Sequence, residues 1–337
     1  MERIWSKYAK DRVGDVLCVA GWVQSRRDHG KIIFIDLRDR SGILQTVFTP
    51  EDSALYKLAD SLRPEWVIEV TGKVEKRPNG MENPNIPTGL VELKASELKI
   101  LAKAKTPPFP LDTDGYEIDE ELRLKYRYLD LRRERLKKNL ILRHKASQFV
   151  RRFLDGRGFI EVETPYITKG TPEGAREFVI PSRLHPGKFY TLPQSPQQFK
   201  QLLMVAGLEK YFQLARVFRD EDPRKDRAYG EATQIDIEMS FVTQDDVLKL
   251  TEEMFINLVK EVFPEKKISQ VPFPRIPYDE SMAKYNTDKP DLRKNSQDSN
   301  ELAFCFIIDW PMFGWNESEN RWDPHHHIFT SPHKEDI

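Results

Sequence analysis

Five segments with strand character follow one another closely in the first 101 residues of this chain. They read VLCVAGWV, IIFIDLRD, ILQTVF, WVIEVTGKV and LVELKASELKI, and each is rich in β-branched and aromatic residues. Turn-forming residues separate them at 28–30, 40–42 and 78–80. A short helical piece is expected at 54–62. The pattern predicts a small five-stranded barrel, and a plain β-sandwich is the alternative.

The pattern changes after the barrel. The segment Thr106–Pro110 contains three prolines and is expected to be a linker. Helices are then expected up to Gly156, around 199–205 and at 247–263, together with an antiparallel strand pair, YFQLARVFRDE and ATQIDIEMSF. We therefore predict an α+β protein with an N-terminal five-stranded OB-fold barrel at 1–105, a linker or hinge at 106–138, and an antiparallel-sheet domain at 139–337.

The second strand of the expected pair alternates cleanly between polar and apolar residues. Such alternation predicts a strand with two different faces. The residues expected on the polar face are Gln234, Asp236, Glu238 and Ser240, and those on the apolar face are Thr233, Ile235, Ile237, Met239 and Phe241.

Positive charge is concentrated in one stretch, although the net charge of the chain is only −1. Between Leu122 and Arg152 there are twelve Lys or Arg residues, against only Asp130 and Glu134. Two interpretations are open for this stretch: contact with phosphates, or a solvated helix face.

The cysteine content and the hydropathy indicate the compartment. Cys18 and Cys305 lie far apart and form no ligand pair, which favours a reducing compartment over a disulfide scaffold. No apolar run approaches the roughly 20 residues of a membrane span, and residues 1–11 are too polar for a signal peptide. We expect a cytoplasmic location and no membrane partner.

The sequence lacks the common nucleotide-binding motifs. It contains no Gly-x-Gly-x-x-Gly, no Walker-type Gly-Lys-Ser/Thr loop and no nucleophile elbow. Any nucleotide chemistry must therefore use a site built on antiparallel strands.

Seven segments, taken in order, carry a family resemblance. Arg132–Thr164, followed by Pro165, has the long helix and the strand of motif 1 of class II aminoacyl-tRNA synthetases, and VFRDED…TQIDIEMSF is similar to their motif 2. The remaining segments read GWVQSRRDHG…FIDLRDRSG, RLKYRYLDLRR, TPEGAREF, LPQSPQQFKQ and HHIFTSP. Together they resemble the bacterial-type aspartyl-tRNA synthetases over almost the whole chain.

This resemblance implies a function and a set of partners. The expected reaction is ATP-dependent activation of L-aspartate to aspartyl-adenylate, with Mg²⁺, and transfer of the aspartyl group to tRNA(Asp). The barrel is expected to bind the anticodon. The second domain is expected to be a class II catalytic domain that forms a homodimer through motif 1.

Activation needs positioned charges more than it needs a nucleophile, because the carboxylate of the amino acid itself attacks the α-phosphorus of ATP. Arg219 matches the family arginine that bridges the α-phosphate and this carboxylate, and a guanidinium can form two parallel hydrogen bonds there. A surface ion pair with Asp220 or Glu221 is the alternative. Asp220 and Glu221 follow in the segment that meets ATP.

A pocket for aspartate needs a cation for the side chain and acceptors for the ammonium group. Lys200 matches the cation, and His326 matches a histidine in a loop that closes over aspartate. The residues matched to the surroundings of the amino group are Glu173, Ser195, Gln197 and Asp236. For Asp236, a solvent-facing strand is the alternative. The run His325–His327 suggests a metal site less well, because adjacent residues cannot easily chelate one ion.

The barrel carries residues matched to anticodon recognition. Phe34 matches the residue that stacks on the central base, and Gln45 matches a hydrogen-bonding residue beside it. Arg27 and Glu92 match further contacts. Plain barrel core is the alternative for Phe34, because both its sequence neighbours are isoleucines.

His29 bears on which tRNA is accepted. In the family, a histidine at this place tends to accompany enzymes that also accept tRNA(Asn), and a leucine tends to accompany strict enzymes. We therefore hypothesise a non-discriminating ancestry.

The sequence departs from the family in three places. The motif 2 loop, Arg227–Thr233, is one residue longer than usual and has Ala232 where a phenylalanine normally stacks on adenine, so Tyr229 is the candidate replacement. Only a short polar stretch, 294–300, stands where bacterial enzymes carry an insertion domain. Motif 3, the magnesium-binding acids and a second aspartate-binding arginine are expected beyond Ile337. We therefore expect no metal ligand within the chain, and no pyrophosphate exchange by residues 1–337 alone.

Two rival functions remain. An asparaginyl-tRNA synthetase is the closer one, but Lys200 would place a cation where a neutral amide should bind. A catalytically inactive, tRNA-binding relative of the synthetases is the other. The retained Glu173, Lys200 and Arg219 argue against long decay.

Overall fold

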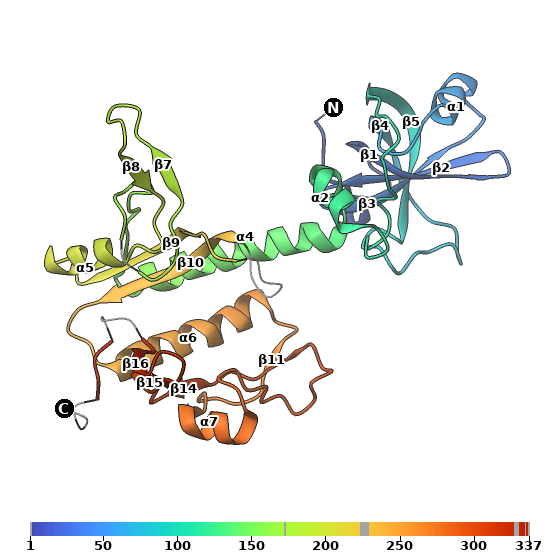
Figure 1. Ribbon diagram of the computed structural model, residues 1–337. Helices are drawn as coiled ribbons and strands as arrows, with labels where there is room; N and C mark the ends of the chain where they lie inside the picture. The colour runs from blue at the N-terminus through green and yellow to red at the C-terminus, as the bar shows by residue number, and fades with distance from the viewer. Residues whose placement is uncertain (1, 172, 223–228, 327–329, 334, 336–337) are drawn as a thin grey trace. The chain divides into compact units, whose positions relative to one another are not determined.

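The chain divides into two compact units. The computed structural model describes residues 2–171, 173–222, 229–326, 330–333 and 335. The units are Met1–Leu140 and Ile141–Ile337, and the colour bar of Figure 1 locates each of them. The first unit contains both the barrel and the expected linker, and the boundaries at 105 and 138 stay predictions.

Five strands of the first unit close into a barrel in the order β1-β2-β3-β5-β4. They are β1 (Val16–His29), β2 (Ile32–Asp39), β3 (Gly42–Phe48), β4 (Val67–Lys76) and β5 (Val91–Ala102). A 3-10 helix, η1 (Ser6–Asp11), precedes them, and α1 (Ser53–Asp60) follows β3. Asp52 caps α1 by accepting hydrogen bonds from the backbone N–H groups of Ala54 and Leu55. The five-stranded barrel is confirmed, and the sandwich alternative is wrong because the sheet closes on itself.

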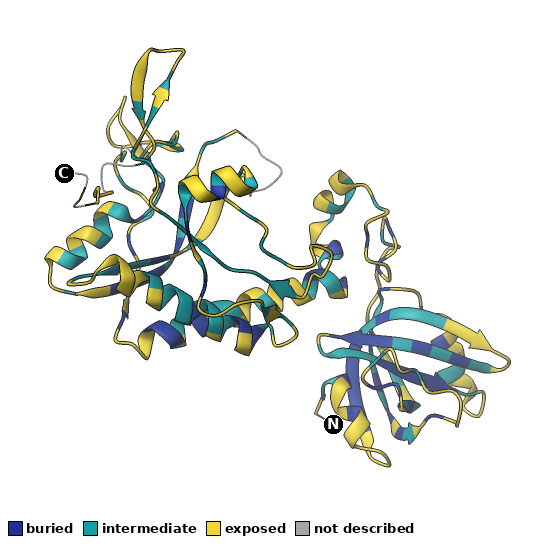
Figure 2. Cartoon of the chain, turned by 90° about the horizontal axis from the view of Figure 1, so that it is seen from below, coloured by how far each residue is buried: buried dark blue, intermediate teal, exposed yellow. Residues whose placement is uncertain are grey.

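Alternation along the strands fills the barrel interior. In β2, the side chains of Ile33, Ile35 and Leu37 are 0% exposed, and each contributes about 1.5–3 kcal/mol relative to an exposed side chain. The bands of dark blue along the barrel strands in Figure 2 mark such residues. At Gly21, a Cβ would lie 2.2 Å from the main-chain oxygen of Arg38, so the close approach of β1 and β2 requires glycine.

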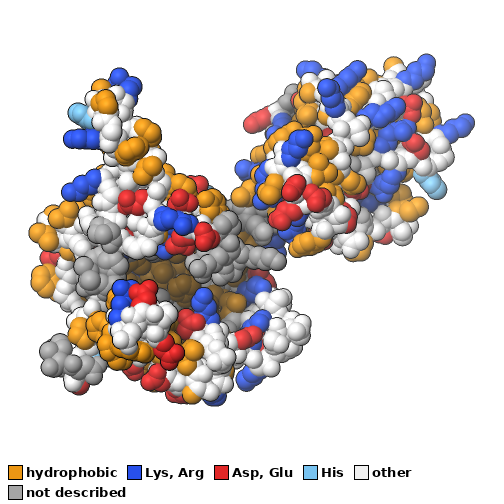
Figure 3. Space-filling view, in the orientation of Figure 1, with side chains coloured by type: hydrophobic (Ala, Val, Ile, Leu, Met, Phe, Trp, Pro, Cys, Tyr) orange, Lys and Arg blue, Asp and Glu red, His pale blue; other side chains and the backbone are white. Residues whose placement is uncertain are grey.

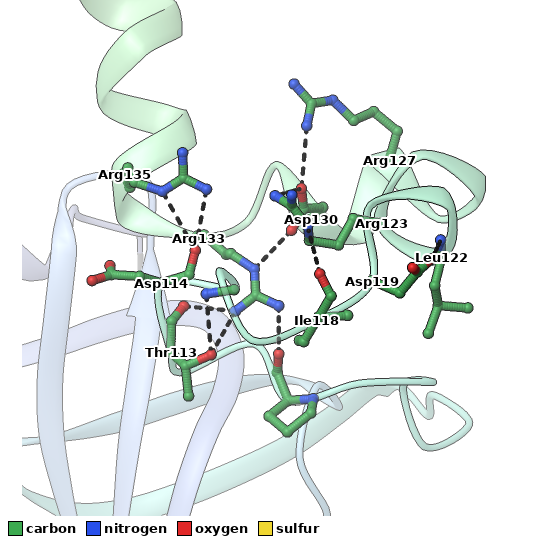
Figure 4. A network of polar contacts seen from close by, with 12 residues as sticks. Thr113, Asp114, Ile118, Asp119, Leu122, Arg123, Arg127, Asp130, Arg133 and Arg135 are labelled. Carbon is green, nitrogen blue, oxygen red and sulfur yellow. Dashed lines mark hydrogen bonds and ion pairs between the residues drawn. The ribbon is translucent and has the colours of Figure 1, made fainter.

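A buried arginine organises the segment after the barrel (Figure 4). This segment includes α2 (Glu120–Lys125) and α3 (Arg127–Asp130). Arg133 Nε donates to Asp130 Oδ1 at 2.7 Å, and its Nη1 and Nη2 donate to the main-chain oxygens of Thr113 and Pro110 at 2.6 and 2.7 Å. The exposed fractions of Arg133 and Asp130 are 1% and 0%. The linker is thus held by one satisfied, buried ion pair.

Part of the basic stretch is paired within the first unit. Arg123 and Arg127 lie 3.8 and 3.1 Å from Asp130 Oδ2. Arg132 pairs with Glu65, a buried residue that lies in the sequence between α1 and β4. For these residues the structure favours an intramolecular role over phosphate contact. The basic residues farther along the stretch stay open to either interpretation.

The second unit is built around a three-stranded sheet in the order β10-β9-β6. Its strands are β6 (Ile160–Glu161), β9 (Lys210–Arg219) and β10 (Gly230–Met239), and the helices whose side chains share its core are α4 (Glu134–Asp155) and α6 (Gln244–Val262). Apolar side chains of β9 and β10, among them Phe212 and Ile237, pack against Phe153 of α4 and Met254 of α6. Strands β9 and β10 are antiparallel, as expected, whereas β6 pairs with β9 in parallel.

The predicted alternation along β10 is matched only in part, because Ile235 on the predicted apolar face is 40% exposed. Asp236 on the polar face is only 3% exposed, and Ile237 on the apolar face packs against the core. The predicted apolar face was too long, because β10 ends at Met239. Phe241 follows with a left-handed φ of 58° and is 94% exposed.

Shorter elements surround the sheet. They are β7 (Val179–Pro181), β8 (Phe189–Thr191), α5 (Gln197–Val205), β11 (Lys267–Ile268), β12 (Arg275–Pro277), α7 (Tyr278–Tyr285), β13 (Glu301–Leu302), β14 (Phe306–Ile308), β15 (Phe313–Asn316) and β16 (Arg321–Pro324). The pairs β11–β13 and β12–β14 are parallel, unlike the antiparallel arrangement expected. None of the helices in the described ranges has the length and apolar character needed to cross a membrane.

Candidate functional site

A largely covered lysine lies against the polar face of β10. Lys200, on α5, places its Nζ 2.9 Å from Asp236 Oδ1 and 3.3 Å from Glu238 Oε2. Its side chain is 12% exposed. The other oxygen of the carboxylate, Asp236 Oδ2, is buried and has no hydrogen-bond partner among the described residues. This group therefore offers both a cation and an unused acceptor to a bound molecule.

A second polar group lies at the start of the same helix. Ser195 Oγ donates to Glu173 Oε2 at 2.5 Å and accepts from the backbone N–H of Gln197 at 3.2 Å. Gln197 is the first residue of α5, one turn before Lys200. Glu173 Oε1 is buried, and no described residue forms a hydrogen bond with it. The structure thus joins Glu173, Ser195 and Gln197, and α5 connects them to Lys200 and Asp236.

A cavity of about 340 Å³ lies at the end of the β9–β10 hairpin. Arg219, Glu221, Tyr229 and Ala232 contribute to its lining. Arg219 Nε donates to the main-chain oxygen of Gln194 at 3.4 Å. The structure therefore brings the predicted phosphate-binding arginine and the candidate adenine-stacking tyrosine to one cavity.

Asp220 connects the two strands of this hairpin. Its carboxylate accepts a hydrogen bond from the Tyr229 hydroxyl at 3.2 Å, and this bond raises the pKa of Tyr229. Its backbone N–H donates to the main-chain oxygen of Arg176 at 3.0 Å. The segment 223–228, which includes Arg227 of the predicted loop, lies outside the described residues.

His326 lies in a different environment from the other predicted residues. Its ring meets Trp310 edge-on, with 5.6 Å between the ring centroids, and it lines a cavity with Ile307 and Phe313. The structure does not join it to Lys200 or Asp236, and its role as a loop residue over aspartate stays a prediction. His327 lies outside the described residues.

The described part of the chain contains no group of three or more His, Cys, Asp or Glu side chains arranged to hold a metal ion.

On the barrel, a polar network runs across the outer face of four strands, β1, β2, β3 and β5. Arg27 Nη2 donates to Asp36 Oδ1 at 2.8 Å and to Gln45 Oε1 at 3.3 Å. Gln45 Nε2 donates in turn to Glu92 Oε2 at 2.8 Å. The predicted anticodon residues Arg27, Gln45 and Glu92 therefore form one continuous group.

Phe34 lies beside this network. It is directly opposite Arg27 in the β1–β2 register, and its side chain is half-buried while both isoleucines next to it are fully buried. Because successive side chains of a strand point to opposite faces, Phe34 belongs to the outer face. The interpretation of Phe34 as plain barrel core is therefore disfavoured. His29 is exposed at the end of β1, before Gly30 with its φ of 62°.

Three residues in these groups were missed from the sequence. Arg77, at the end of β4, is buried, and desolvation lowers its pKa while Glu92 and Asp36 oppose that shift. Tyr211 is also buried, and its burial, followed by the nearby Asp236 carboxylate, raises its pKa. Gln194 is 2% exposed and contacts the loop that carries Glu173. For Arg77, the polar run 76–80 beside a strand was an available signal. For the other two, only burial identifies them.

The visible face of the first unit carries many lysine and arginine side chains, drawn in blue in Figure 3. Such a surface is suited to a phosphate backbone. The fold is thus a five-stranded closed barrel followed by an α+β unit that contains the Lys200 and Glu173 groups.

Comparison with known proteins agrees with this combination. The family model of class II tRNA synthetases (D, K and N) matches residues 119–337, and the model of the OB-fold nucleic acid binding domain matches residues 17–101. The chain belongs to the class II tRNA synthetases of the D, K and N group.

Curated relatives carry a more specific name than the family model. Proteins named aspartate–tRNA(Asp/Asn) ligase from Rubrobacter xylanophilus and Dehalococcoides mccartyi are 55% and 57% identical over 281 and 285 residues. These alignments cover 83% and 84% of this chain, and 46% and 47% of the relatives. The chain therefore spans about half the length of the curated relatives it matches.

Solved structures also match. An asparaginyl-tRNA synthetase from Pyrococcus horikoshii, complexed with asparaginyl-adenylate, is 25% identical, with a TM-score of 0.72 over 84% of this chain and 66% of that one. The asparaginyl-tRNA synthetase of Entamoeba histolytica, at 22% identity and a TM-score of 0.73, covers 85% of this chain and 66% of its own, and supports the fold alone. The predicted fold class is confirmed. The roles of the individual site residues stay predictions.

Proposed function

We propose that this chain carries the aspartate-binding and anticodon-binding parts of an aspartate–tRNA ligase. The observation that carries the proposal is Lys200, only 12% exposed, beside Asp236, whose second oxygen has no hydrogen-bond partner in the described part of the chain. A substrate with a side-chain carboxylate and an ammonium group matches both features. The neutral amide of asparagine would offer no negative charge to Lys200 beyond that of Asp236 and Glu238, which disfavours the asparaginyl alternative.

The named residues would divide the work as follows. Lys200 binds the side-chain carboxylate, while Asp236 Oδ2 and Glu173 Oε1 accept hydrogen bonds from the ammonium group. Arg219 holds the α-carboxylate against the α-phosphate of ATP, and Tyr229 stacks on adenine. Such groups lower the barrier by placing the reactants and by neutralising charge as it develops.

The chemistry then follows in two steps. An oxygen of the α-carboxylate forms a bond to the α-phosphorus, and pyrophosphate leaves. A ribose hydroxyl at the end of the tRNA then attacks the carbonyl carbon, and AMP leaves. Mg²⁺ bound to the nucleotide would neutralise phosphate charge.

The partners follow from the same assignment. The barrel face formed by Arg27, Phe34, Gln45 and Glu92 would bind the anticodon of tRNA(Asp), with tRNA(Asn) as a second substrate. Curated relatives named for both tRNAs support this reading. Exposed apolar residues of α4, Leu140 and Ile141, support a homodimer through motif 1.

Calorimetric titration of the chain with non-hydrolysable aspartyl- and asparaginyl-adenylate analogues tests the proposal. We expect the aspartyl analogue to bind more tightly. Equal affinity, or a preference for the asparaginyl analogue, would reject the aspartate assignment. Binding of tRNA without either analogue would favour the catalytically inactive relative.

Replacing Phe34 by Ala is expected to weaken tRNA binding by about 1–3 kcal/mol, because one base–aromatic stack is lost. Filter binding at fixed salt measures the change. Val47→Ala, the cross-strand neighbour of Phe34, is the matched control for a loss of packing. Equal effects of the two substitutions would leave Phe34 without a stacking role.

The presence of His29 predicts comparable binding of tRNA(Asp) and tRNA(Asn). His29→Leu is expected to shift the preference towards tRNA(Asp), and competition between the two tRNAs measures it. A hundredfold preference of the unmodified chain for tRNA(Asp), about 2.7 kcal/mol, would contradict the hypothesis.

A further inference from the structure

The loop that carries Glu173 is held by one buried side chain from outside it. The described loop residues are Thr171 and 173–177, and none of them belongs to a helix or strand. Gln194 Oε1 accepts a hydrogen bond from the backbone N–H of Ala175 at 2.8 Å, and its Nε2 donates to the main-chain oxygen of Thr171 at 3.1 Å. The side-chain amide of Gln194 is therefore hydrogen-bonded to the loop at two places, Thr171 and Ala175.

A carboxylate completes this connection. Glu177 Oε1 accepts from the backbone N–H of Thr171 at 2.7 Å and from Gln194 Nε2 at 3.4 Å. Gly170 permits the arrangement, because a Cβ there would lie 2.7 Å from Glu177 Oε2. A carboxylate at 194 could still accept from Ala175 but could not donate to Thr171 or Glu177.

The same short segment also fixes the other substrate-binding groups. The main-chain oxygen of Gln194 accepts from Arg219 Nε at 3.4 Å, and the neighbouring Ser195 donates to Glu173. Pro193 is anchored to β9, because its main-chain oxygen accepts from the backbone N–H of Phe218 at 2.9 Å. A shift of this segment would therefore move the ammonium-binding carboxylate and the arginine together.

We infer that Gln194 is a positioning residue, which holds the Glu173 loop in the conformation that binds the amino acid. It acts through Glu173 and Arg219 and does not itself contact substrate. The inference rests on the proposed function for its effect on binding. Its effect on the loop does not depend on that function.

Three variants test the inference in the full 337-residue chain. Gln194→Glu keeps the shape and the acceptor for Ala175 but removes both donors and places a second carboxylate beside Glu177. Glu177→Gln keeps the acceptor for Thr171 and turns a donor towards Gln194. The double variant Gln194→Glu/Glu177→Gln restores a donor opposite an acceptor. Gln201→Glu, the same change on the exposed face of α5, is the matched control.

Two measurements are made on each variant. Hydrogen exchange of peptides covering 171–178 measures how readily the loop opens, and peptides of β10 serve as an internal reference for folding. Calorimetry reads the affinity for the aspartyl-adenylate analogue. Each single variant is expected to increase loop exchange and to weaken binding about tenfold, the effect of roughly one lost buried hydrogen bond. The double variant should recover part of both losses, and Gln201→Glu should change neither.

The outcomes separate the two proposals. Unchanged loop exchange in both single variants, or a double variant no better than either, would overturn the positioning role. If Gln194→Glu also increases hydrogen exchange in β10, the test depends on Glu177→Gln alone. In that case, loop exchange in Glu177→Gln equal to that of the unmodified chain would reject the inference. Failure of the unmodified chain to bind the analogue would reject the proposed function, while the exchange data would still decide whether Gln194 anchors the loop.

Discussion

Replacing Lys200 by Met is expected to weaken binding of the aspartyl-adenylate analogue by about 2–5 kcal/mol, the usual cost of removing one partner of a buried charge pair. The substrate carboxylate loses its cation, and Asp236 and Glu238 lose theirs. Binding of the asparaginyl analogue should fall less, because an amide does not depend on the positive charge. The preference for aspartate should therefore shrink or reverse. Calorimetry with both analogues measures this change.

Lys249→Met is the control for this experiment. Lys249 is exposed on α6, so its removal should alter neither affinity. Since the lysine substitution also leaves Asp236 buried without a cation, circular dichroism must show that the Lys200→Met variant is folded. A folded variant that keeps the full aspartate preference would show that Lys200 does not bind the side chain.

Replacing Arg133 by Met is expected to lower the opening free energy of residues 110–133 by about 3–5 kcal/mol, the usual cost of breaking a buried ion pair. Asp130 would keep Arg127 and Arg123 at 3.1 and 3.8 Å but lose its 2.7 Å partner. The main-chain oxygens of Thr113 and Pro110 would each lose a donor. Hydrogen exchange resolved by peptide measures the change without interference from the second unit.

The control is an arginine two residues away. Arg135 also donates to a main-chain oxygen, that of Asp114, but it is only partly buried and forms no ion pair with any described residue. Arg135→Met is therefore expected to cost less than about 1 kcal/mol. Equal effects of the two substitutions would mean that burial of the Arg133–Asp130 pair does not stabilise the linker.

These expectations depend differently on sequence and structure. The lysine could be named from its segment, because QSPQ-x-FK resembles a family motif. Its partner Asp236 was placed on a polar strand face by alternation alone, since strand periodicity is local. Whether that face pointed to solvent or to a pocket could not be decided locally. The structure decides it by packing α5 over the strand and burying the carboxylate.

The linker shows the opposite case. The twelve basic residues between Leu122 and Arg152, some of which lie in the linker, looked alike in sequence, and both a solvated helix face and contact with phosphates were open for them. Four of them instead pair with Asp130 or Glu65. Glu65 precedes Arg132 by 67 residues, so no local pattern connects the two. Gln194 was missed for the same reason, because its partners lie 17 to 25 residues away in a loop and on another strand.

What the sequence by itself determined was the number and order of the barrel strands, the antiparallel strand pair and the motif residues. Each of these depends on side-chain periodicity, turn chemistry or short-range resemblance. The tertiary structure alone decided the closure of the barrel through the parallel contact of β3 and β5, the outward position of Phe34, and the parallel pairing of the short strands. These features arise where distant segments meet, and there the free energy depends on burial and on hydrogen bonding between partners that the local sequence does not specify.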